Sequence, residues 1–323
     1  MKRLLTLVAI LYCWYAQAQV TVVTAQGPGP YSKTKREAFM DSFRHSTTIF
    51  ILQYRDYEQL AAYEQAIKRS WTVTPYKIIR PEELLAYEGK TGYSFFSFAA
   101  FYTGKHNTTQ HLMYGLWMPM LNKKGRFKNQ YFFAQILLYP EWNKRINMAD
   151  YSRSKHKYDA SLMNCVLDQA TFYNWNATFL GGYLKTIDQR LKDNRKYDSW
   201  YDYSVETIAT LKKDTLFIPA YTKIKEKIWQ NAVYNDSTLT EESIHAEYPY
   251  PVQFITLDGL EKRVQSGLAT NYLVFTVDAS TKYIDIYSNT SGLIYNHMSL
   301  LSWTFKNKDM AHITQAIQQV NTR

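Results

Sequence analysis

A short pattern that occurs twice constrains the architecture of this chain most strongly. Residues 74–87 (TPYKIIRPEELLAY) and 250–264 (YPVQFITLDGLEKRV) both predict a strand that runs into a short helix. The two segments match at one offset, 251 − 75 = 176. The matched pairs are Pro75 with Pro251, Ile79 with Ile255, and Leu84 with Leu260. A motif used twice predicts two copies of one structural unit.

The segments before and after this motif also match in the same order. DTLFIPAY (214–221) aligns with TTIFILQY (47–54), and the strand predicted at 271–280 follows as the strand at 92–104 does. We therefore predict an α/β fold of two tandem repeats, 32–200 and 201–323, after an extended lead-in at 19–31. In each repeat, a strand–helix–strand opening requires a parallel pair, and the closely spaced strands that follow favour antiparallel pairing.

Hydrophobic periodicity places the remaining elements. Apolar residues at helical spacing predict helices at 56–71, around 161–172, and at 181–196, 204–213, 223–234 and 309–320. Longer apolar runs separated by turn residues predict strands at 92–104, 110–120 and 129–140. Each repeat is thus expected to form a mixed sheet with helices packed on it.

The second repeat resembles a known α/β unit. In the N-terminal domains of TolB and in curli-secretion (CsgG-type) proteins, a strand ending near an acidic residue leads into a short helix and two further strands with a Ser/Thr-Gly turn. The residues in the matching places are Asp258, Tyr272, Leu273, Val274, Ser291 and Gly292. The resemblance covers about one hundred residues, and the tandem arrangement and the middle insertion depart from it. It implies the fold and, beyond that, assembly in the cell envelope through protein contacts.

The N-terminus has the pattern of a secretory signal peptide at 1–18. Lys2 and Arg3 precede an apolar run at 4–15, and Ala16-Gln17-Ala18 supplies small residues for cleavage after Ala18. We expect an exported protein, periplasmic or secreted. A retained anchor stays open, and Tyr12 before Cys13 argues against a lipoprotein signal.

The basic charge is concentrated in one part of the chain. The formal net charge is +10, and residues 119–200 hold 14 basic and 7 acidic side chains. Because an exported protein rarely meets nucleic acid, the expected counterpart is an envelope protein or an anionic glycan or lipid surface. A solvated basic surface without a partner is the alternative. No second apolar run is long enough to span a membrane after the signal.

Catalytic and cofactor motifs are not found in the sequence. It has no phosphate-binding glycine loop, no GxSxG elbow and no HExxH. His106 and His111 lack an evident third metal ligand, and Cys165 lies among apolar residues with His156 as its nearest histidine. We therefore expect no catalytic residues, no metal and no cofactor, and keep an enzyme of unrecognised type as a further alternative.

Aromatic residues mixed with cations and amides mark the insertion at about 119–178 and its flank as the expected binding region. Tyr and Trp suit protein contact or sugar stacking, because they bury a flat surface and keep a polar edge. The predicted binding residues are Lys123, Lys124, Arg126, Trp142, Lys144, Arg145, Trp175, Trp200 and Tyr201. The expected function is a non-enzymatic exported scaffold or binding protein that acts through protein contacts. The alternative is a glycan- or lipopolysaccharide-binding module.

Overall fold

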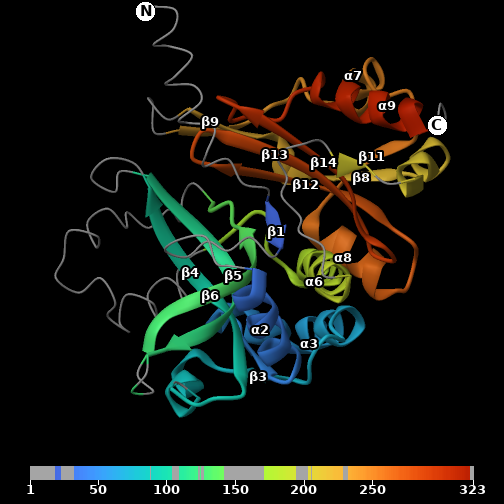
Figure 1. The fold of residues 1–323 in the computed structure, drawn as a ribbon. Helices are drawn as coiled ribbons and strands as arrows, with labels where there is room; N and C mark the ends of the chain where they lie inside the picture. Colours follow the sequence, from blue (N-terminus) through green and yellow to red (C-terminus); the bar gives the residue numbers. More distant parts are fainter. Residues whose placement is uncertain are drawn as a thin grey trace, which may run out of the picture.

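Two six-stranded mixed sheets form the framework of the molecule (Figure 1). The computed structural model describes residues 19–22, 33–87, 89–103, 109–122, 124, 127–141, 171–193, 203–204, 206–227 and 232–320. The first sheet contains β1 (Val20–Val22), β2 (Thr47–Ile51), β3 (Tyr76–Ile79), β4 (Tyr93–Thr103), β5 (Thr109–Leu121) and β6 (Phe127–Leu137). The second contains β7 (Tyr203–Ser204), β8 (Leu216–Pro219), β11 (Val252–Ile255), β12 (Asn271–Asp278), β13 (Thr281–Ser288) and β14 (Gly292–Leu300).

Helices connect the strands and cover the sheets. The α-helices are α2 (Lys33–Arg44), α3 (Leu60–Ser70), α6 (Ala177–Lys192), α7 (Glu241–His245), α8 (Leu257–Gln265) and α9 (Asp309–Val320). The 3-10 helices are η2 (Tyr54–Gln59), η3 (Pro81–Ala86), η5 (Glu206–Lys212) and η6 (Ala220–Lys223). Their buried faces follow the helical periodicity of the sequence, as with Tyr63 and Ile67 on α3. No helix in the described ranges is long and apolar enough to cross a membrane.

The two sheets have the same topology. The first runs β3-β2-β4-β5-β6-β1, and the second runs β11-β8-β12-β13-β14-β7. In each, the first three strands of this order are parallel and the rest pair antiparallel. A register shift interrupts the corresponding hairpins, at Leu116/Trp117 in one and at Ile286/Tyr287 in the other. The predicted α/β fold of two repeated mixed sheets is confirmed.

The hydrogen-bond ladders correct the residue alignment of the repeats. The amide of Thr48 donates to Pro75 O, and the amide of Leu216 donates to Pro251 O. Since the two prolines correspond, Thr48 corresponds to Leu216, at an offset of 168 (216 − 48) where the sequence match gave 167. Thr48 pairs with Ser94 and Leu216 pairs with Asn271, so Ser94 corresponds to Asn271. The shift of one residue exchanges the faces of a strand.

The helix predicted at 223–234 is wrong. This segment contains β9 (Ile224–Lys227) and β10 (Ala232–Asn235), which pair antiparallel as a separate ribbon. The alternation of Lys and Ile or Glu in KIKEK fits the two-residue period of a strand, and Val233 and Tyr234 favour strands. An ion pair between Lys225 and Asp236 ties the two strands together. Charge alternation was therefore misinterpreted as a helix face.

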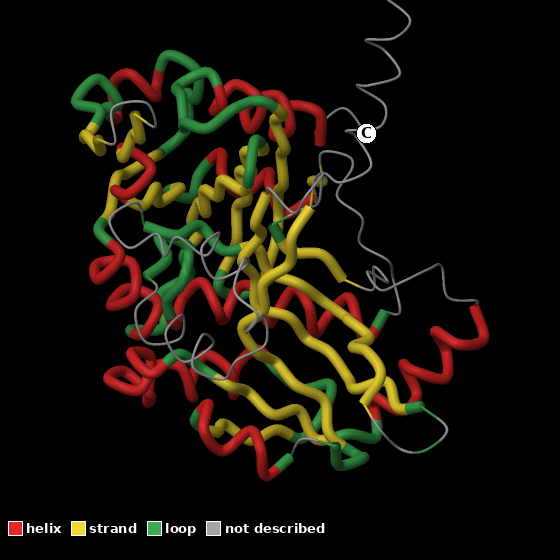
Figure 2. The backbone as a smooth tube through the Cα atoms, turned by 90° about the vertical axis from the view of Figure 1, so that its left-hand side faces the viewer, coloured by secondary structure: helices red, strands yellow, loops and turns green. Residues whose placement is uncertain are grey.

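Helix α6 lies between the two sheets (Figure 1). It contacts α3 and β1 of the first repeat and β14 and α8 of the second, and Figure 2 shows helices crossing the middle of the molecule between the two groups of strands. The helix begins four residues earlier than predicted, because the Asn176 side chain caps it by accepting from the amide of Phe179 (2.8 Å). A Cβ at Gly182 would overlap the Tyr272 hydroxyl, so only glycine fits at that contact.

Buried polar contacts join the repeats. The Asn174 amide donates to Leu137 O and to Thr276 Oγ1 (both 2.9 Å), and its oxygen accepts from the amide of Tyr139 (2.8 Å). His111 Nδ1 and Asp278 Oδ2 lie 2.6 Å apart between β5 and the end of β12. One continuous apolar core contains residues of both repeats. The two sheets therefore form one packed structure.

Candidate functional site

The predicted binding residues fall mostly outside the described residues. Lys123, Arg126, Trp142, Lys144, Arg145, Trp200 and Tyr201 lie there. Lys124 is exposed in the turn after β5, and its amide donates to Asn122 Oδ1 (2.8 Å).

Trp175 is a core residue. Its ring stacks on Tyr114 at a centroid distance of 4.0 Å, and 7% of its surface is exposed. Its Nε1 donates to the buried carboxylate of Asp56 (3.1 Å), which also accepts from the amide of Gln53 (3.0 Å). Burial raises the pKa of Asp56. Trp175 thus packs the interior and supports the turn after β2. The sequence had instead predicted that Trp175 is a binding residue.

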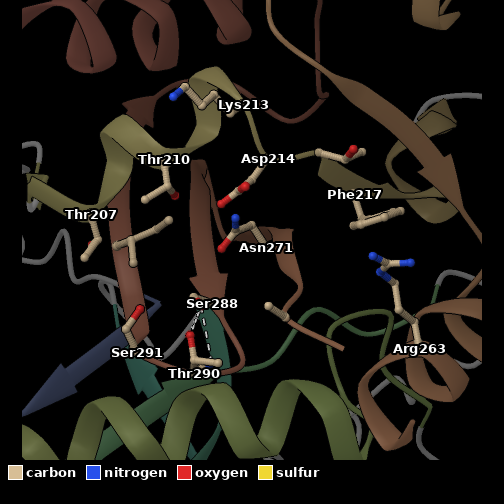
Figure 3. Close-up of a pocket in the computed structure, with 13 residues that line it drawn as sticks. Thr207, Thr210, Lys213, Asp214, Phe217, Arg263, Asn271, Ser288, Thr290 and Ser291 are labelled. Carbon is tan, nitrogen blue, oxygen red and sulfur yellow. Dashed lines mark hydrogen bonds between the residues drawn. The ribbon is translucent and has the colours of Figure 1, made fainter. Parts of the chain in front are cut away.

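A polar pocket of about 450 Å³ lies at the amino ends of β8 and β12 in the second repeat (Figure 3). We call this site the polar pocket. It is lined by Thr207, Thr210, Lys213, Asp214, Thr215, Phe217, Arg263, Ala269, Asn271, Ser288, Thr290, Ser291 and Ile294. Most of these side chains carry a hydroxyl, an amide or a charge, so the pocket offers hydrogen-bonding groups from several elements.

The turn after η5 and helix α8 position the charged groups of the pocket. The 3-10 helix η5 ends just before Lys213, and the amides of Lys213 and Asp214 donate to Thr210 O (both 2.9 Å). This turn presents Asp214 just before β8 begins. From the other side, α8 presents Arg263, whose guanidinium carbon lies 4.5 Å from the centre of the Phe217 ring. Such a cation–π contact holds the guanidinium at the wall of the pocket.

Asp214 and Asn271 point into the same space at the centre of the pocket (Figure 3). Within the described part of the chain, neither side chain has a hydrogen-bond partner. Only 9% of the Asn271 surface is exposed. The Asn271 amide is not among the fully buried polar groups without a partner in the described residues, so its atoms remain reachable from the pocket. The pair is therefore available to a ligand.

The turn between β13 and β14 forms a fixed wall. Ser288 Oγ and Thr290 Oγ1 share a hydrogen bond (2.8 Å), which leaves the adjacent Ser291 facing the pocket. Asn289 accepts from the amide of Thr270 (3.0 Å) and so ties the turn to the segment before β12. Gly292 has a φ of 79°, and a Cβ there would lie 2.9 Å from Thr186 Oγ1. Glycine is thus required at this bend.

The corresponding place in the first repeat is closed by its own hydroxyl groups. At the offset of 168, Ser46 corresponds to Asp214, and Ser46 Oγ donates to Ser94 Oγ (2.9 Å). Ser94 Oγ also bonds with Thr48 Oγ1 (2.8 Å), which in turn bonds with Thr74 Oγ1 (2.6 Å). All four side chains are buried. We call this set (Ser46, Thr48, Thr74 and Ser94) the hydroxyl corner.

Bulky side chains also fill the first repeat where the second is hollow. Met118 pairs with Tyr131 after the register shift, and Ser288 pairs with Gly292 after the equivalent shift. Tyr131 is buried and stacks on Phe39 at a centroid distance of 4.3 Å. Counted back from the aligned strands, Thr207 of the 3-10 helix η5 has the sequence place of Phe39 in α2 (39 + 168 = 207). The side chains of Ser288, Gly292 and Thr207 are smaller than those of Met118, Tyr131 and Phe39. This difference leaves the space that forms the polar pocket.

The sequence contained a signal for this site that only the correct register reveals. The pairs Ser46/Asp214 and Ser94/Asn271 stand out once the repeats are aligned by their ladders.

Among the described residues, no group of three His, Cys, Asp or Glu side chains could hold a metal ion. Comparisons with protein-family models, curated proteins and solved structures find no match for this chain. The assignment of function therefore depends on the geometry of the pocket.

Proposed function

We propose that this chain is an exported binding protein of the cell envelope whose polar pocket holds a saccharide unit. One observation carries the proposal. The second repeat places Asp214 and Asn271, without partners among the described residues, where the first repeat has a closed Ser46–Ser94 hydrogen bond. The signal-peptide pattern at 1–18 supports the export.

The chemistry of the pocket suits a ligand rich in hydroxyl groups. A carboxylate accepts from two hydroxyls, and an amide both donates and accepts, so Asp214 and Asn271 can each engage neighbouring hydroxyls of one sugar ring. Ser291 adds a further donor and acceptor. Because Lys213 and Arg263 outnumber the single acid, a saccharide with one acidic substituent fits best.

A glycan array probed with the mature chain, followed by calorimetric titration of the best ligand, tests this proposal. The key variant is Thr207→Phe/Ser288→Met, which introduces the side chains that fill the first repeat. We expect it to weaken binding at least thirtyfold and to leave the melting temperature within a few degrees. Asp41→Ser, on the exposed surface of α2, is the matched control. Saccharide binding that survives the filled pocket would place the ligand elsewhere.

A second candidate function is capture of an envelope protein through the basic insertion. Its supporting observation is the excess of basic side chains in this part of the chain, 14 against 7 acidic ones over residues 119–200. The residues that flank 142–170 are joined: the amide of Glu141 donates to Thr171 O, and Thr171 Oγ1 donates to Glu141 Oε2 (both 2.8 Å). Because these ends are already joined, residues 142–170 can be replaced by a short linker. Phe172 and Asn174 are buried and must be kept.

The deletion separates the two candidates. We expect the shortened chain to retain its melting temperature and its saccharide binding. If the insertion captures a partner, a pull-down from the native envelope will lose that partner with the deletion and keep it with Thr207→Phe/Ser288→Met. A partner retained by the shortened chain would exclude the insertion as the contact.

A further inference from the structure

Three neighbouring apolar side chains project into solvent at the end of β14. The exposed fractions are 49% for Leu300, 74% for Leu301 and 47% for Trp303. Among the described residues, the other exposed large apolar side chains are scattered singly along the sequence: Leu85, Phe127, Tyr234 and Leu268. Scattered residues of this kind are ordinary, whereas a contiguous group marks a contact surface. We call Leu300, Leu301 and Trp303 the apolar tip.

The backbone holds the tip in a defined conformation. Leu301 and Ala279 both have a φ of 53°, in the left-handed region that L-residues other than Asn and Asp seldom adopt. The Trp303 indole donates to Ala279 O (3.1 Å), which joins the tip to the turn between β12 and β13. A leucine in a disfavoured conformation with its side chain in solvent does not serve packing, so the conformation indicates a role for the surface.

A buried ion pair anchors the base of the tip. Lys282 Nζ lies 2.7 Å from Asp309 Oδ1 and also donates to Thr304 O (3.3 Å). Phe305, the next residue after Thr304, is fully buried and packs edge-on against Phe275. The apolar side chains are thus presented on a rigid support at the end of the sheet.

The chain segment that carries the tip is positively charged. From Asn296 to Lys308 the chain carries no acidic side chain, and Lys306 and Lys308 are exposed. The nearest acids in the sequence and in the neighbouring turn are both engaged, Asp309 by Lys282 and Asp278 by His111. A surface that complements the tip must therefore be apolar at its centre and anionic around it.

We propose that the apolar tip docks the protein on an anionic lipid surface. Leu300 and Leu301 enter the acyl region, Trp303 lies at the interface that tryptophan prefers, and Lys306 and Lys308 meet the headgroups. This inference rests on the proposed export, which brings the chain to an envelope membrane, and is independent of the saccharide site. The tip and the polar pocket lie at opposite ends of β12, about 23 Å apart at roughly 3.3 Å per residue, so the docked protein presents its pocket away from the lipid.

Vesicle sedimentation of the mature chain tests the docking. The probes are phosphatidylcholine vesicles with and without phosphatidylglycerol. We expect binding to the anionic vesicles, at least tenfold weaker binding for Leu301→Asp, and unchanged binding for Leu85→Asp, a matched control with an isolated leucine that is 79% exposed. Lys306→Glu and Lys308→Glu should each weaken binding to the anionic vesicles about fivefold, and a higher salt concentration should also weaken it. Melting temperatures confirm that each variant is folded.

Several results would overturn the proposal. They are absence of binding to either vesicle, equal loss with Leu85→Asp and Leu301→Asp, and a concentration-dependent dimer in ultracentrifugation that Leu301→Asp dissociates, which would assign the tip to a second copy of the chain. Thr207→Phe/Ser288→Met should bind vesicles like the wild type. Vesicle binding therefore fails or succeeds separately from saccharide binding.

Discussion

The hydroxyl corner of the first repeat and the polar pocket of the second occupy the same place in the same topology. In the first, Ser46 and Ser94 bond to each other, and Phe39 and Tyr131 stack on each other. In the second, longer polar side chains stand where the serines were, and small residues replace the aromatic pair. The strand ladders are equivalent, so the difference lies in a few side chains. We therefore propose that the first repeat uses these polar groups for stability, whereas the second repeat leaves the corresponding groups available to a ligand.

The largest expected effect removes the aromatic cover of the first repeat. Tyr131→Ala deletes a buried ring that contacts both Phe39 and Phe133. We expect the free energy of unfolding to fall by about 3–5 kcal/mol, the usual cost of emptying an aromatic site in a core. Urea denaturation measures it, with Phe127→Ala on the exposed start of β6 as the control. A loss near that of the control would mean that the contacts of Tyr131 with Phe39 and Phe133 do not stabilise the fold.

The next effect concerns a buried acid on β13 that has no acidic counterpart at the same position of the first repeat. By the same register, Gly115 stands where β13 carries Asp285, and burial raises the pKa of Asp285 to about 7. The folded state then keeps a proton that the unfolded state has lost above a pH of about 4. Stability therefore falls as the pH rises from about 4 to about 7, by roughly 4 kcal/mol, and is constant above that range.

Asp285→Asn tests the sign of this dependence. The variant has no ionisable group at this position, so the fall of its free energy of unfolding with rising pH should lack the part caused by Asp285. The variant should therefore be more stable than the wild type, most clearly at neutral pH. Asp56 and Glu261, whose pKa values burial also raises, contribute slopes of the same sign in both proteins. Identical pH profiles would show that Asp285 ionises freely in the folded state.

A smaller difference in stability is expected between matched polar residues of the hydroxyl corner and the polar pocket. Ser94→Ala removes an acceptor and a donor from the hydroxyl corner and should cost about 1–2 kcal/mol of stability. Asn271→Ala removes a side chain that has no partner among the described residues and should change stability by less than about 0.5 kcal/mol. The same variant should lower saccharide affinity about tenfold. Equal losses of stability would show that Asn271 in the polar pocket stabilises the fold as much as Ser94 in the hydroxyl corner does.

The sequence predicted the topology because hydrophobic periodicity and order survive divergence between the repeats. It did not predict the pocket, because TTIFI and DTLFI look most alike at an offset of 167, one residue from the alignment that the ladders impose. That single residue exchanges strand faces and hides the relation of Ser46 to Asp214. Trp175 was misjudged for another reason. Its local sequence resembles a polar aromatic loop, and only its tertiary contacts with Tyr114 and Asp56 bury it.

The most direct test of the central claim grafts the first repeat's serine pair into the second. Asp214→Ser/Asn271→Ser reproduces a pair that forms a hydrogen bond in the equivalent corner, so the variant should fold with an unchanged or raised melting temperature. Calorimetric titration with the best saccharide from the array then compares it with the wild type. We predict that the graft weakens binding at least tenfold. Equal affinity of the graft and the wild type would contradict the account.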